Sequence, residues 1–168
     1  MGHYNILNVF FENPGQEFQI RGIARLLKIS KTAASYHINN LVKEKLVIRS
    51  RKGIFPSYFG AETKLFKYYK ASVGIEQIIK SGLVEFLEKL NPSCIILFGS
   101  FAEGEYDSKS DIDLFVLAKD TKIDLSRFED RLGHKINIIF SEDLNSISSQ
   151  LYNNIINGFK LAGFIKAR

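Results

Sequence analysis

Two short groups of residues in the second half of the chain could do chemistry together. Gly99 and Ser100 end an apolar run, and Asp111 and Asp113 follow after ten further residues. Glycine lets the backbone approach a phosphate closely, and a serine hydroxyl can bond a phosphate oxygen. Because side chains alternate along a strand, we expect the two carboxylates to share one face and to repel each other. Oxygen ligands of this kind suit Mg²⁺, so the sequence predicts a metal site that would bridge a triphosphate.

The pattern Gly-Ser, ten residues, Asp-x-Asp resembles that of the polymerase-beta-type nucleotidyltransferase superfamily, and within it the minimal nucleotidyltransferases of bacteria and archaea. The resemblance runs over residues 84–165. It implies ATP or another NTP as substrate, Mg²⁺ as cofactor, and transfer of a nucleotidyl group to a hydroxyl, which a protein partner could carry. It implies Asp111 and Asp113 as catalytic residues and metal ligands, and Gly99, Ser100 and Asn137 as nucleotide-binding residues.

The chain departs from that family at two positions. The family usually supplies a third carboxylate from a later strand, and Asn137 stands at the matching position. An amide can ligate a metal or form hydrogen bonds, but it cannot act as a base for an attacking hydroxyl. The position after Ala102 is often basic, and here Glu103 would repel a triphosphate. Other carboxylates, Glu129 and Asp130, are interpreted as solvated surface groups. Two functions therefore stay open: a transferase, or a regulator whose nucleotidyltransferase domain is inactive and serves as nucleotide sensor or dimerisation unit.

Hydrophobic periodicity and turn residues predict the elements that must position these groups. For the second half we expect an α+β fold, a small mixed-sheet domain with strands over 93–98, 112–118 and 135–140 and helices over 126–132 and 142–165. For the first half we expect helices over 3–12, 20–28 and 31–45, strands over 46–51 and 54–59, and amphipathic helices over 62–90.

The predicted helix over 31–45 has an apolar face and a polar face. Residues 31–52 contain six basic residues and one acidic residue, a cluster that could neutralise several phosphates. Residues 3–60 resemble the winged helix-turn-helix domains of bacterial and archaeal transcription regulators. The matching runs are Ile23-Ala24-Arg25-Leu26-Leu27, Ser30-Lys31-Thr32-Ala33, His37-Ile38-Asn39-Asn40-Leu41 and Leu46-Val47. The resemblance implies binding of duplex DNA, with use of the winged helix only for dimerisation or protein contact as the alternative. The expected DNA-binding residues are Lys31, Thr32, Ser35, Tyr36, Asn39, Lys43, Arg49, Arg51 and Lys52.

Composition and charge bound the remaining possibilities. The net charge is +5, and the charged residues are unevenly distributed. Residues 1–90 hold 14 Lys/Arg and 7 Asp/Glu, whereas residues 91–168 hold 9 Lys/Arg and 11 Asp/Glu. A basic half beside an acidic half suggests separate tasks, a polyanion partner for one and a cation for the other. The single cysteine, Cys94, excludes an intrachain disulfide and is expected to be a buried core thiol.

The expected organisation follows from these patterns. We expect a winged-helix DNA-binding domain over 1–61, a helical connector over 62–83 and a minimal nucleotidyltransferase domain over 84–168. Winged helices that read palindromic sites usually act as dimers, so a homodimer is expected, with residues 62–90 as its contact. No membrane span or secretory signal is recognised, so we expect a cytoplasmic protein.

Overall fold

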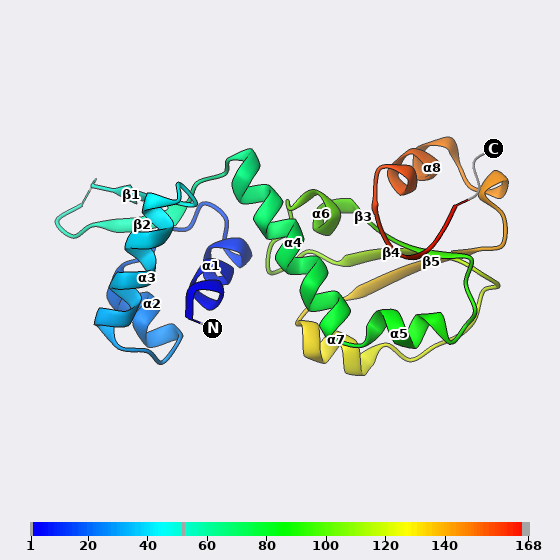
Figure 1. Ribbon diagram of the computed structural model, residues 1–168, viewed down its shortest axis with the longest axis horizontal. Helices are drawn as coiled ribbons and strands as arrows, with labels where there is room; N and C mark the ends of the chain where they lie inside the picture. Colours follow the sequence, from blue (N-terminus) through cyan, green and yellow to red (C-terminus); the bar gives the residue numbers. More distant parts are fainter. Residues whose placement is uncertain (1, 52, 166–168) are drawn as a thin grey trace. The chain divides into compact units, whose positions relative to one another are not determined.

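The computed structural model describes residues 2–51 and 53–165 and divides the chain into two compact units, Met1–Lys70 and Ala71–Arg168 (Figure 1). The long helix α4 (Lys64–Lys80) contributes residues to both. No helix of the described part is both long and apolar enough to cross a lipid bilayer.

The first unit consists of a helical group followed by a hairpin. Its elements are α1 (Gly2–Glu12), α2 (Ile20–Leu26), α3 (Lys31–Lys43) and the antiparallel strands β1 (Val47–Ser50) and β2 (Ser57–Gly60). The Ser30 hydroxyl accepts a hydrogen bond from the Ala33 amide at 3.1 Å, which caps α3. The helices predicted to end at 28 and 45 end about two residues earlier, because Lys28 and Lys45 adopt positive φ angles of 53° and 59°.

The second unit contains a four-stranded mixed sheet. Its strands are β3 (Cys94–Phe98), β4 (Ile112–Leu117), β5 (Ile136–Ser141) and β6 (Phe159–Gly163), in the order β5-β4-β3-β6. The β4–β5 pair is parallel, and β3 is antiparallel to both β4 and β6. The helices are α5 (Leu83–Glu88), α6 (Gly99–Glu103), α7 (Ser126–Leu132), α8 (Ser149–Ile156) and the 3₁₀ turn η1 (Leu144–Ser146).

The single helix predicted over 142–165 is wrong. The segment forms η1, α8 and then the strand β6, which pairs with β3. A Cβ on Gly158 would lie 2.5 Å from the Leu97 carbonyl oxygen, so only glycine allows this close approach of the two backbones. Pairing with β3 supplies hydrogen-bond partners to a strand edge that would otherwise be open, and this tertiary gain outweighs the local helical pattern.

The central strand β3 is buried along its whole length because apolar residues pack on both faces of the sheet. Ile95 and Leu97 belong to a core cluster that includes residues of α5 and α7, whereas Cys94 and Ile96 belong to a second cluster that includes α8. Figure 1 shows α8 on one side of the sheet and α5 and α7 on the other. Cys94 is fully buried, as expected, and burial raises the pKa of its thiol. The sheet is therefore the middle of three layers, between α8 on one face and α5 and α7 on the other.

Candidate functional site

Asp111, Asp113 and Asn137 meet at one end of the sheet. Asp113 on β4 is the register partner of Asn137 on β5 and, on its other side, of Phe98 at the end of β3. The Asn137 Nδ2 donates one hydrogen bond to Asp111 Oδ2 and one to Asp113 Oδ1, each at 3.2 Å. Asp111 and Asn137 are exposed and Asp113 is half-buried. Two carboxylates therefore share one amide donor at a place that solvent can reach.

Gly99 lies against this cluster directly after β3. Its φ of +69° is in the left-handed region, and a Cβ added there would lie 2.8 Å from Asp113 Oδ2. Both the backbone conformation and the space therefore require glycine. Ser100 follows in the first turn of α6 and is half-buried. The structure thus places the glycine expected at a phosphate-binding position beside the carboxylate expected to hold a metal.

The backbone that carries Asp111 is fixed to the segment that leads into β5. The His134 Nδ1 lies 2.7 Å from the Ser110 carbonyl oxygen, and the Ile112 amide donates to the Lys135 carbonyl at 2.8 Å. These bonds flank Asp111 on both sides and hold its carboxylate near Asn137. No sequence motif singles out His134, because its role depends on two segments that come together only in the folded sheet.

Glu129 supports the same edge of the sheet from α7. Its Oε1 accepts a hydrogen bond from the Ile136 amide at 3.0 Å, and its Oε2 accepts one from Lys135 Nζ at 2.8 Å. The Lys135 ammonium, and after it the Ile136 amide, hold the pKa of Glu129 below its ordinary value, and Glu129 in turn raises the pKa of Lys135. The interpretation of Glu129 as a solvated surface group is therefore wrong, whereas Asp130 is exposed as expected.

The loop between α6 and β4 is partly ordered by its own acidic side chains. Asp107 Oδ1 accepts hydrogen bonds from the Lys109 amide at 2.9 Å and the Ser110 hydroxyl at 3.1 Å, which form a turn just before Asp111. The buried Tyr106 ring stacks on Phe101 with centroids 4.0 Å apart. This stack anchors the loop to the core and so restrains the position of the backbone that leads into Asp111.

The donor set has a composition that fits a hard divalent cation. It offers carboxylate oxygens from Asp111 and Asp113, both within 3.2 Å of a single nitrogen, and an amide that can turn to present its own oxygen. Within residues 2–51 and 53–165, no group of three or more His, Cys, Asp or Glu side chains is arranged to hold a metal ion. The fit therefore depends on two carboxylates and one amide, and a bound substrate would have to supply the remaining oxygen ligands.

Comparison with known families agrees with this arrangement. The model of the family described as Polymerase beta, Nucleotidyltransferase matches residues 70–161, which include Gly99, Ser100, Asp111, Asp113 and Asn137. The chain belongs to this nucleotidyltransferase family. Searches of the curated proteins and of the solved structures found no match. The family assignment covers nearly all of the second unit and does not reach the expected DNA-binding residues.

Most of those residues are exposed on α3 and on the segment that contains β1. On α3, Ala34, Ile38 and Leu41 are fully buried, whereas the polar residues expected to meet DNA are on the accessible side. Lys52 lies outside the described residues. Ser35 is half-buried, and the others are exposed: Lys31, Thr32, Tyr36, Asn39, Lys43, Arg49 and Arg51.

Proposed function

We propose that the second unit binds an NTP with Mg²⁺ and transfers a nucleotidyl group to a hydroxyl acceptor. The observation that carries this proposal is the convergence of Asp111, Asp113 and Asn137 beside Gly99 in a chain of the nucleotidyltransferase family. In the reaction, the acceptor oxygen forms a bond to the α-phosphorus and the bond to the departing pyrophosphate breaks. The acceptor hydroxyl loses its proton in the same step.

The residues divide this task by their chemistry. The Gly99 backbone and the Ser100 hydroxyl bind phosphate oxygens, while Asp111 and Asp113, with the Asn137 oxygen after rotation of the amide, hold the metal. Bound Mg²⁺ supplies charge neutralisation at the phosphates and orients them. Since Asn137 cannot accept the proton, that proton passes to Asp111, to Asp113 or to water.

The test measures label transfer from ATP in the presence of Mg²⁺ to candidate protein and nucleic-acid acceptors. We expect Asp111→Ala combined with Asp113→Ala to abolish transfer, and Asp130→Ala, which removes an exposed carboxylate from α7, to leave it unchanged. Transfer that survives the double substitution would assign the activity to another site.

A second function is favoured by two specific residues. Asn137 replaces the carboxylate that would accept a proton, and the exposed Glu103 closes α6 with a negative charge that opposes a triphosphate. Both features support a regulator in which this unit senses a nucleotide without turnover. Calorimetry with ATP and Mg²⁺ followed by product analysis separates the two: heat of binding without pyrophosphate favours the sensor, and pyrophosphate release excludes it.

For the first unit we propose a winged helix that binds duplex DNA. The order of three helices and a hairpin supports this proposal, as does the polar, accessible side of α3. Residues 1–70 also hold 12 Lys/Arg against 4 Asp/Glu. Binding of a labelled duplex over a range of salt concentrations tests it, because neutralised phosphates make affinity fall steeply with salt. Salt-independent binding, or none, would contradict it.

Palindromic DNA sites would require two copies of the chain, so we also propose a homodimer that forms through α4. This helix exposes four large apolar or aromatic side chains, Leu65, Tyr68, Tyr69 and Ile79. Sedimentation of the parent chain and of Leu65→Ser combined with Tyr68→Ser tests the contact: a dimer that persists in the variant places the interface elsewhere.

A further inference from the structure

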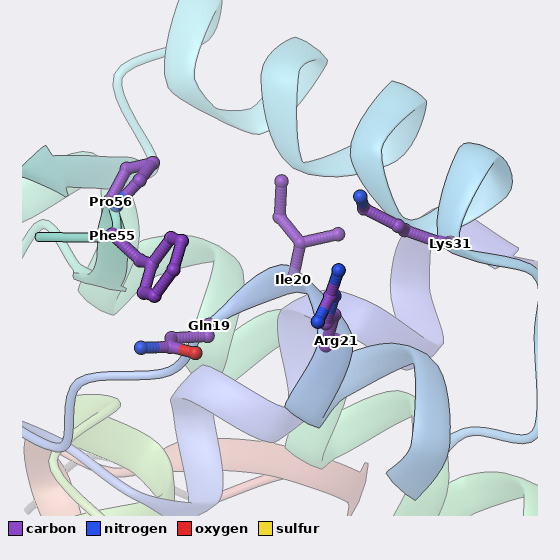
Figure 2. A pocket seen from close by; sticks show the side chains of 6 residues that line it. All are labelled: Gln19, Ile20, Arg21, Lys31, Phe55 and Pro56. Atoms are coloured by element: carbon purple, nitrogen blue, oxygen red, sulfur yellow. The ribbon is translucent and has the colours of Figure 1, made fainter.

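A pocket of about 270 Å³ lies in the first unit where three segments meet. Its walls come from the start of α2, the start of α3 and the loop that leads into β2 (Figure 2). The lining residues are Gln19, Ile20, Arg21, Lys31, Phe55 and Pro56. The pocket uses only one of the residues expected to bind duplex DNA, Lys31.

The walls of the pocket combine positive charge with an aromatic ring. Arg21 and Lys31 line it without any acidic lining residue, and among the described residues neither forms an ion pair with an acidic side chain. Figure 2 shows the side chains of Arg21 and Phe55 bordering the same space, with Gln19 at its edge. The Gln19 side chain makes no capping hydrogen bond to α2, so its amide is not occupied by the helix that it precedes.

The loop that leads into β2 exposes two large apolar side chains beside the positive charges of the pocket. The side chain of Phe55 is 67% exposed and that of the neighbouring Ile54 is 95% exposed. In a duplex the bases are stacked on each other and offer no free face, so an exposed ring gains little from paired DNA. An unpaired base offers a planar face, and stacking of such bases on aromatic side chains is the usual way in which proteins bind single strands.

We propose that this pocket binds one unpaired nucleotide, with the base stacked on Phe55 and the phosphate held by Arg21 and Lys31. The Gln19 amide is placed to form hydrogen bonds with the edge of the base. The volume lies just below the roughly 300 Å³ at which pockets for drug-sized ligands begin, which suits a single nucleotide and excludes an enclosed longer strand.

The nucleotide could be free or could be the unpaired end of a strand, and both present the same base and phosphate. An acidic peptide would neutralise Arg21 and Lys31 but would leave the Phe55 ring without a planar partner. The inference goes beyond the proposed nucleotidyl transfer, because none of the lining residues belongs to the second unit. It is also separable from duplex binding, because Lys31 is the one lining residue that is also expected to contact a duplex.

The absence of tryptophan from the chain allows a local probe. In the full chain carrying Phe55→Trp, a base that stacks on the ring should quench its fluorescence. The titrants are AMP, ribose 5-phosphate, oligo-dT, a blunt duplex and the same duplex with an unpaired end. EDTA is present throughout, so that metal-dependent binding in the second unit does not contribute. We expect quenching by oligo-dT and by the duplex with an unpaired end, and little by ribose 5-phosphate or the blunt duplex. Quenching by AMP as well would identify free nucleotides as ligands too.

Matched variants without the probe measure the energetic role of the pocket. Phe55→Ala should weaken binding of the duplex with an unpaired end by about tenfold, whereas Ile54→Ala, which changes the adjacent exposed residue, should change it by about twofold at most. Arg21→Ala should weaken it more than Arg25→Ala, an exposed arginine on the same helix that does not line the pocket. Lys31 is not substituted, because it is also one of the residues of α3 that are expected to contact duplex DNA.

Three results would overturn the proposal: equal effects of Phe55→Ala and Ile54→Ala, quenching by ribose 5-phosphate as strong as that by oligo-dT, or an acidic peptide that competes as well as oligo-dT. Loss of blunt-duplex binding alone would count against the winged-helix proposal and not against the pocket, because AMP and oligo-dT test the pocket without a duplex.

Discussion

The two units differ in how they distribute charge. Residues 1–70 hold 12 Lys/Arg and 4 Asp/Glu, and the lysines and arginines on α2, α3 and β1 are all exposed. Residues 71–168 hold 11 Lys/Arg and 14 Asp/Glu. In the second unit, strand pairing brings Asp111 and Asp113 to one amide nitrogen. A small cation is coordinated by converging ligands on rigid elements, as in the second unit. A polyanion binds to basic side chains spread over a surface, as in the first unit. The comparison predicts that the two units respond to different substitutions.

The largest expected change comes from restoring a carboxylate at position 137. Asn137→Asp should raise the rate of label transfer from ATP by about 100-fold, since general-base catalysis contributes about that factor or more. Without Mg²⁺, the three carboxylates should repel one another and lower the melting temperature, and added Mg²⁺ should restore it. Asn137→Ala is the control, because it removes the amide without adding a base. Equal rates for Asn137→Asp and the parent would show that the missing base does not limit the site.

The basic residues of the β1–β2 hairpin allow the matching test of DNA binding in the first unit. Replacing Arg49, Arg51 and Lys52 together with Ala should weaken duplex binding by about 100-fold at low salt and reduce the salt slope by about 3, if each side chain meets a phosphate. ATP binding should not change. The matched control replaces Lys109, Lys119 and Lys122, three exposed lysines of the second unit, and alters net charge equally. If both triple variants lose the same affinity, only the overall charge matters.

Gly99 allows backbone strain to be separated from site geometry. Both Gly99→Ala and Gly133→Ala place an alanine at a φ near +70°, which costs about 1 kcal/mol or more of stability. Only at position 99 would the new Cβ contact Asp113, since nothing lies within 4 Å of a Cβ at position 133. We expect Gly99→Ala to reduce ATP binding with Mg²⁺ by about tenfold or more, as a displaced ligand does, and Gly133→Ala to leave it unchanged. Calorimetry and urea unfolding of both variants measure the two effects.

The same contrast explains what could be predicted from the sequence. Gly99, Asp111 and Asp113 were predictable because a short motif and strand alternation fix their relation locally. Asn137 was predictable only through the family resemblance, and the structure places it in register with Asp113. The strand β6 was missed because its conformation depends on the edge of β3, and Glu129 and His134 were missed because their partners come from other segments.

The polar side chains of α3 should have a smaller effect on DNA binding, limited to discrimination between sequences. Replacing Ser35 and Asn39 with Ala should relax discrimination between preferred and scrambled duplexes by about fivefold to tenfold, within the range of a base-edge contact. Non-specific affinity should stay close to that of the parent, because neither side chain carries charge. Competition binding with the two duplexes measures the ratio. A uniform loss on both duplexes would mean that these side chains contact the DNA backbone instead.

The smallest expected effect is on stability and concerns Glu129, which already has hydrogen-bond partners in the second unit. Lys135 and the Ile136 amide lower the pKa of Glu129, so its ionised form stabilises the fold. That contribution is present above the ordinary glutamate pKa of about 4.3 and is lost as the pH falls through the lowered value. Glu129→Gln should therefore lower the urea midpoint at neutral pH, and the difference from the parent should shrink below about pH 4. Asp130→Asn changes the net charge equally on the same helix and is the control. A difference that stays constant from neutral to acid pH would show that the Glu129 carboxylate supports β5 by shape and not by charge.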